Sequence, residues 1–61
     1  MKYEYMVIYS FGNGTGRICI TRDKKILSYA DVESLDNVIR ETNGHMTAFV
    51  IDFKLLRKYR D

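Results

Sequence analysis

The sequence predicts a small α+β domain with the element order β-β-α-β. Three observations carry this prediction. Residues 3–11 alternate as a strand does, a glycine-rich turn at 12–16 leads into a second alternating stretch, and apolar side chains recur at helical spacing over 29–42. A third strand is expected over residues 46–53.

The stretch from Tyr3 to Phe11 is apolar or aromatic on both of its alternating faces. Its odd positions hold tyrosine, valine and phenylalanine, and its even positions include Met6 and Ile8. A half-exposed strand should show one polar face, so this strand is expected to have a neighbour on each side and material above and below. We therefore place it at the centre of the sheet.

Residues 12–16, Gly-Asn-Gly-Thr-Gly, are expected to form a hairpin turn, because glycine accepts the positive φ that tight turns need. A phosphate-binding loop would require a helix directly afterwards. Residues 17–22 instead alternate as a strand, with Ile18 and Ile20 on one face and a more polar face opposite, as is typical of an edge strand.

The helix has recognisable ends. Ser28 is a good N-cap, and Asp31 three residues later resembles the acidic member of a capping box. Gly44 follows the last periodic residues and is the usual residue just past a helix C-terminus. A frayed turn of helix is one interpretation of the basic tail, residues 54–61, whose conformation the sequence leaves open.

These elements give one topology for a single domain over residues 1–61. The predicted sheet order is 2-1-3, with antiparallel pairs around the first strand and the helix on one face. A chain of 61 residues buries only about 60% of its unfolded surface, so its stability is expected to be marginal. Cys19 is the only cysteine and no cluster of metal ligands exists, so oligomerisation is the leading explanation of how the domain holds together.

The second face of the sheet is expected to be an interface. The sequence leaves open whether the odd or the even residues of the first strand face the helix. If the even set does, an aromatic set is left outward, and exposed patches of that size usually mark interfaces. The candidate interface residues are Tyr3, Tyr5, Tyr9, Phe11, Phe49 and Phe53.

Two occupants of that face are considered. The sheet could pack against its own copy, in the isologous contact of a twofold dimer, or it could bind a different macromolecule. The homodimer is favoured, because the size argument demands additional burial under every condition.

Catalysis, cofactors and metals are not expected. His45 is the only histidine and is interpreted as a loop residue, and Cys19 as a small buried residue rather than a nucleophile. A two-layer domain of this size offers little volume for a catalytic pocket. A lone thiol, no apolar run near the roughly 20 residues of a membrane span, and no signal-peptide pattern favour the cytoplasm.

The net charge of +2 is small but unevenly distributed. The helix is acidic, whereas the second strand with its following turn and the tail are basic. A nucleic-acid surface is the alternative that this pattern suggests. Its candidate contacts are Arg17, Arg22, Lys24, Lys25, Arg57 and Lys58. The simpler interpretation, that these residues protect an edge strand and keep a terminus soluble, is favoured, because the basic excess is small for a footprint of many phosphates.

Four segments carry a resemblance to small proteins encoded by phages and prophages of Gram-positive bacteria. They are Ile8-Tyr9-Ser10, the hairpin from Gly14 to Thr21, the helix start Ser28-Tyr29-Ala30-Asp31, and Phe49-Val50-Ile51-Asp52-Phe53. The resemblance implies an accessory protein that binds and inhibits or modulates a host protein, such as a component of antiviral defence. Together the residues and the resemblance predict a non-enzymatic, homodimeric protein-binding module.

Overall fold

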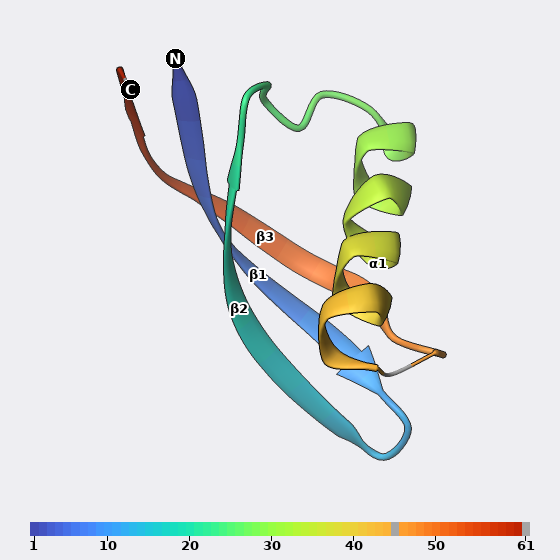
Figure 1. Ribbon diagram of the computed structural model, residues 1–61. Helices are drawn as coiled ribbons and strands as arrows, with labels where there is room; N and C mark the ends of the chain where they lie inside the picture. Colours follow the sequence, from blue (N-terminus) through green and yellow to red (C-terminus); the bar gives the residue numbers. More distant parts are fainter. Residues whose placement is uncertain (45, 61) are drawn as a thin grey trace.

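The computed structural model describes residues 1–44 and 46–60, with the side chain of residue 43 left out, and these residues form a three-stranded sheet with one helix against it (Figure 1). The elements are β1 (Lys2–Phe11), β2 (Gly14–Arg22), α1 (Tyr29–Asn43) and β3 (Phe49–Tyr59). The strand order is β2-β1-β3, and β1 pairs antiparallel with both neighbours. The predicted α+β class, the order 2-1-3 and the central first strand are confirmed.

The hairpin turn is shorter than the sequence suggested. Gly12 takes a φ of +49°, and β2 already begins at Gly14, opposite Phe11. Gly16 lies opposite Tyr9, and a Cβ atom there would stand 2.5 Å from Cζ of the Tyr9 ring. Two of the glycines therefore belong to the strand, where aromatic rings of β1 cover them.

Both predicted helix ends are confirmed. The Asp31 carboxylate accepts hydrogen bonds from the backbone N–H of Leu27 (2.9 Å) and of Ser28 (3.2 Å), which fixes the chain as it enters α1. At the other end Gly44 is left-handed, with a φ of 73°, and its N–H donates to the carbonyl of Arg40 at 2.9 Å. This is the arrangement that glycine permits without steric cost.

The odd residues of β1 face the helix and form the core. Val7 is fully buried and Tyr5 and Tyr9 are 3% and 8% exposed, packed with Leu35 and Ile39 of α1 and with Ala48. The Tyr5 hydroxyl accepts the backbone N–H of Ile26 at 2.9 Å, so its polar atom is satisfied under the helix. The face of β1 that the sequence left open is thereby settled.

The expectation that Tyr5 and Tyr9 point outward is wrong for this reason. The pairing of β1 with β2 agrees with this orientation, because Ile20 lies opposite Tyr5 and Ile18 lies opposite Val7. The apolar face of β2 and the odd face of β1 form one continuous surface, in which Ile18 and Ile20 pack against the core cluster that includes Leu35 and Ile39 of α1.

The third strand differs from its predicted bounds. It begins at Phe49, after turn residues that include Met46, and it continues to Tyr59. The conformation of the tail, which the sequence left open, is strand over residues 54–59 and not the suggested helical turn, because this segment pairs with Lys2–Met6 of β1. Residue 61 lies outside the described residues.

Two shifts of register interrupt the β1–β3 pairing. Val50 is opposite Tyr9 and Asp52 is opposite Ile8, so Ile51 between them has no partner of its own. Leu56 is passed over in the same way between Leu55 and Arg57. These bulges bend the strand and re-aim the side chains near them.

Candidate functional site

The structure brings the six predicted interface residues to different places. Tyr5 and Tyr9 lie in the core, and Tyr3 and Phe11 are partly buried against it. Phe49 and Phe53 are the two of the six that are exposed, and both belong to β3. The aromatic patch expected on β1 is thus absent from the described surface, and the exposed large apolar side chains of the sheet lie on the outer strand β3.

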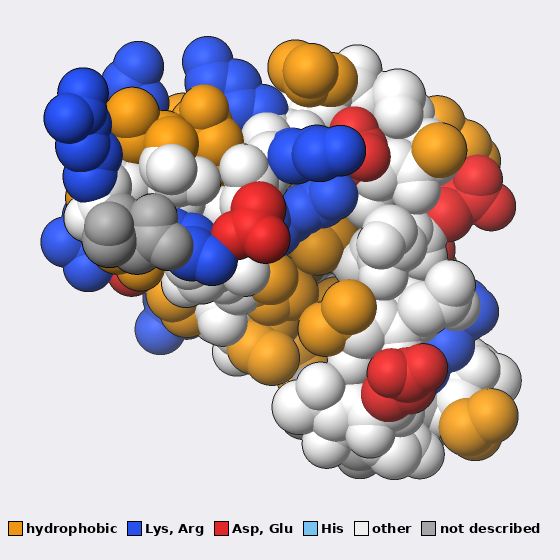
Figure 2. Space-filling view, turned by 45° about the horizontal axis from the view of Figure 1, so that its top comes forward, with side chains coloured by type: hydrophobic (Ala, Val, Ile, Leu, Met, Phe, Trp, Pro, Cys, Tyr) orange, Lys and Arg blue, Asp and Glu red, His pale blue; other side chains and the backbone are white. Residues whose placement is uncertain are grey.

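We name the exposed apolar side chains of β3 the β3 surface. Between 38% and 51% of each remains accessible. Its members are Phe49, Ile51, Phe53, Leu55 and Leu56. Figure 2 shows lysine and arginine side chains crowded around exposed hydrophobic side chains at one end of the molecule.

Three members of this surface were missed by the sequence-based site prediction. Ile51 was assigned to the third strand but not to an interface, and Leu55 and Leu56 were assigned to a helical tail. The adjacent Leu55 and Leu56 do not alternate, and the bulge at Leu56 is what lets both belong to a strand. A signal was present nonetheless, because the apolar run of the third strand continues beyond Phe53 into the tail.

Two carboxylates cap backbone donors of β3. The N–H of Val50 donates to Oδ1 of Asp36 on α1 at 2.7 Å, and the N–H of Phe53 donates to Oδ1 of Asp52 at 2.8 Å. An N–H whose acceptor is a side-chain carboxylate, and not a carbonyl of a neighbouring strand, can pair with a carbonyl of an incoming strand. The stretch from Asp52 to Leu55 is regular and lies between the two bulges.

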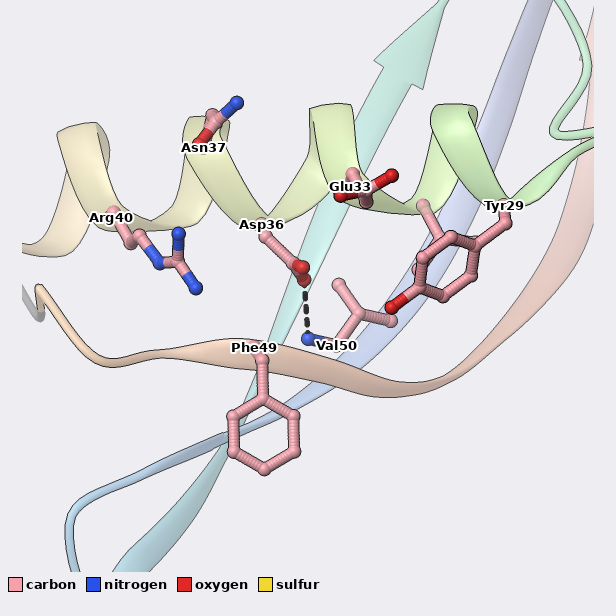
Figure 3. A pocket seen from close by; sticks show the side chains of 8 residues that line it. Tyr29, Glu33, Asp36, Asn37, Arg40, Phe49 and Val50 are labelled. Carbon is pink, nitrogen blue, oxygen red and sulfur yellow. Dashed lines mark hydrogen bonds between the residues drawn. The ribbon is translucent and has the colours of Figure 1, made fainter.

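A groove runs between α1 and the first residues of β3 (Figure 3). Asp36 reaches from the helix to Val50, while the Phe49 ring points away from the helix. Arg40 donates from Nε to the carbonyl of Ala48 at 2.8 Å, which ties the helix to the start of the strand. The residues that line the groove are Tyr29, Val32, Glu33, Asp36, Asn37, Arg40, Phe49 and Val50.

The sheet face away from the helix is mixed in character. Met6 and Ile8 lie at its centre and are only partly exposed. Their cross-strand neighbours are Cys19 and Lys54 for Met6, and Arg17 and Asp52 for Ile8. Cys19 is exposed, so the prediction that it is buried is wrong. Charged neighbours break up the apolar surface of this face.

The six candidate nucleic-acid contacts are divided between the two faces. Arg17 and Arg57 belong to the face away from the helix, because they pair with the even residues Ile8 and Glu4. Arg22 and Lys58 pair with Tyr3 on the helix side. Lys24 and Lys25 lie in the connection to α1.

Three of these cations have local partners. Arg22 lies 3.5 Å from Oδ1 of Asp31, and the Lys25 ammonium is 5.9 Å from the centre of the Tyr3 ring. Arg57 donates to the Glu4 carboxylate at 3.3 Å, and this hydrogen bond raises the pKa of Arg57. Half of the six candidate contacts therefore already have a partner within the domain.

Two carboxyl groups are held in their charged form. The hydrogen bond from Lys2 lowers the pKa of Asp23, which joins the N-terminus of β1 to the loop after β2. The backbone N–H of Leu27 is the main cause that lowers the pKa of Asp31. Asp23 lies at the start of the connection to the helix, and Asp31 lies in the first turn of α1.

Within residues 1–44 and 46–60, no three histidine, cysteine, aspartate or glutamate side chains are grouped as metal ligands would be. His45, interpreted from the sequence as a loop residue, lies outside the described residues. The described part of the chain also contains no helix with the length and apolarity needed to cross a bilayer. Searches for a matching family model, curated protein or solved structure found no match.

Proposed function

We propose that this protein is a protein-binding module that recognises its partner by strand addition at β3. The observation that carries the proposal is the β3 surface itself: five large apolar side chains spaced along an outer strand of 11 residues. A long, apolar outer strand is the usual template for pairing with another chain, because its outward backbone groups supply hydrogen bonds in register.

The surface provides both parts of such a contact. Backbone groups give affinity that depends little on sequence, and side chains at the flanks give selectivity. The Phe53 ring is held in place by an edge-on contact with the buried Tyr5 ring, with 6.0 Å between the ring centres. An anchor held in this way loses little freedom when a partner covers it.

The resemblance to phage and prophage proteins of Gram-positive bacteria supplies the setting of the proposal. In that setting the partner is a host protein, and occupation of its exposed strand or apolar surface inhibits or modulates it. The module contributes no chemistry of its own in this proposal.

Capture from a Gram-positive lysate, followed by binding measurements with the purified partner, tests the proposal. Ile51→Lys and Leu56→Lys place charges on the β3 surface at bulge positions, where neither side chain is in the core. Both are expected to lose the partner. Leu27→Lys is the matched control, since Leu27 is 82% exposed and lies before α1. Equal binding by all four proteins would refute the proposal.

Nucleic-acid binding remains the second candidate, and one arrangement favours it. Arg17, Lys54 and Arg57 belong to the face away from the helix, and the Arg57 guanidinium lies 4.5 Å from the centre of the Tyr59 ring. Basic groups beside an aromatic ring suit the binding of single-stranded nucleic acid, because the cations contact phosphates and the ring can stack on a base. In a gel-shift titration, the affinity for nucleic acid should then fall steeply with salt, and Arg17→Glu should abolish binding. The absence of any shift at low salt would eliminate this candidate.

A further inference from the structure

The charges that border β3 change sign from one end of the strand to the other. Near its start, the groove carries the carboxylates of Glu33 and Asp36 against the cation Arg40, and Asp52 follows within the strand. Its second half is basic, with Lys54, Arg57 and Lys58 in the strand and Arg60 just beyond it. The outer strand therefore has an acidic end and a basic end, with the apolar side chains distributed along both.

We propose that the strand added at β3 is β3 of a second copy, running antiparallel and centred on Phe53. This inference rests on the proposed function, strand addition at β3: in the free protein a second copy occupies the edge, and a host protein would displace that copy to bind there. An antiparallel self-pairing sets the basic half of each copy beside the acidic half of the other, whereas a parallel one sets like charges side by side.

The register centred on Phe53 follows from the regular stretch between the bulges. It places Asp52 opposite the partner's Lys54, and Ile51 opposite the partner's Leu55. The Phe53 N–H gives up the Asp52 carboxylate for a carbonyl of the partner strand, and Asp52 gains a lysine in return. Every exchanged contact is repeated by the twofold axis.

The basic ends extend this contact to the helices. In an antiparallel sheet made by a twofold axis, both copies present the same face to the same side. Lys58 belongs to the helix side, since it pairs with Tyr3, so the partner's Lys58 arrives near Ala48. There it lies beside the groove whose charged lining, among the described residues, is Glu33, Asp36 and Arg40, so it meets two carboxylates and one guanidinium, which is already bound to the Ala48 carbonyl. The twofold contact uses the β3 edge of both copies, so the dimer has a six-stranded sheet with a β2 strand at each outer edge.

The oligomeric state over a concentration series is the first test. Analytical ultracentrifugation of the purified protein should give a dimer at micromolar concentration. Ile51→Lys and Leu56→Lys should shift the protein to monomer, and Leu27→Lys should remain dimeric. Circular dichroism on the same samples establishes that the variants are folded. A wild-type chain that is monomeric throughout this range overturns the inference.

A charge exchange tests the direction of pairing. Glu33→Lys and Lys58→Glu should each raise the dimer dissociation constant by roughly fivefold at low salt, and the double variant should recover most of the loss. Additive losses in the double variant would overturn the antiparallel register.

The two proposals fail differently. A monomeric protein whose β3 variants lose a captured host protein would refute the self-pairing and leave strand addition in place. A monomeric protein whose capture is unaffected by the same variants would refute both.

Discussion

At the scale of single residues, aromatic rings and glycines form matched pairs across the hairpin. The Tyr9 ring occupies the space over Gly16, and the Phe11 ring lies over Gly14, where an added Cβ would stand 3.3 Å from its Cζ. The rings of Tyr9 and Phe11 also contact each other, with centres 5.7 Å apart. These tyrosine and phenylalanine side chains compensate for the missing side chains of β2.

Gly16→Ala should therefore destabilise the domain although alanine suits a strand better than glycine. The new methyl group would displace the Tyr9 ring, and such overpacking typically costs about 1–3 kcal/mol. Urea unfolding measures this as a lower midpoint. Thr15→Ala, at an exposed neighbouring position, is the control and should change the midpoint little. Stabilisation by Gly16→Ala would show that the ring does not occupy this space.

Asp31 gives the fold a dependence on acid. Its pKa in the folded state is lowered, chiefly by the Leu27 N–H, from an ordinary value of 3.8. The stabilisation is complete above that ordinary value and is lost as the pH falls below it, through the lower folded pKa. The unfolding free energy of the wild type should decrease below about pH 4. Asp31→Asn should make this decrease smaller, and Asp23→Asn should remove a further, independent part of it. Unchanged acid slopes for both variants would contradict this account.

The orientation of β1 could have been predicted from the sequence. A hairpin that turns at Gly12 and Asn13 sets Tyr5 opposite Ile20 and Val7 opposite Ile18. Since Ile18 and Ile20 form the apolar face of β2, the odd residues of β1 must share the buried side. The bulges at Ile51 and Leu56 could not be predicted, because they follow from tertiary pairing with β1 and no local residue pattern specifies them.

At the scale of elements, the length of β3 decides how the N-terminal half of β1 is held. Residues Lys54–Tyr59 supply the backbone partners of Lys2–Met6. A chain that ends at Phe53 should lose these partners, and its thermal unfolding should begin at a lower temperature. Differential scanning calorimetry measures this. A nearly unchanged midpoint would instead match a frayed tail, as the sequence alone suggested.

The helix is held to the sheet by a small number of buried side chains. Leu35 and Ile39 are the ones that α1 contributes to the core, at 2% and 0% exposure. Leu35→Ala should cost about 2–5 kcal/mol, the usual range for such a truncation, and in a domain this small that loss removes most of the stability. Val38→Ala, at an exposed position of the same helix, is the control in chemical denaturation. Equal effects of the two changes would contradict the assignment of the core.

At the scale of the whole molecule, the exposed apolar surface of the sheet lies on a different strand from the one that the sequence suggested. The sequence left open which side of β1 faces the helix and placed aromatic residues of β1 in a candidate interface, whereas α1 and the connection before it cover the odd side of β1 within one copy. The even side of β1 carries mixed neighbours. The apolar groups still exposed on the sheet lie along β3, which also carries most of the basic tail. Any association is therefore expected at the edge of the sheet.

The sedimentation of wild-type protein beside Ile51→Lys and Leu27→Lys tests this account most directly. We predict a micromolar dimer for the wild type and Leu27→Lys, and a folded monomer for Ile51→Lys. A dimer that persists in Ile51→Lys and Leu56→Lys alike would place the contact elsewhere and contradict the assignment of the β3 surface.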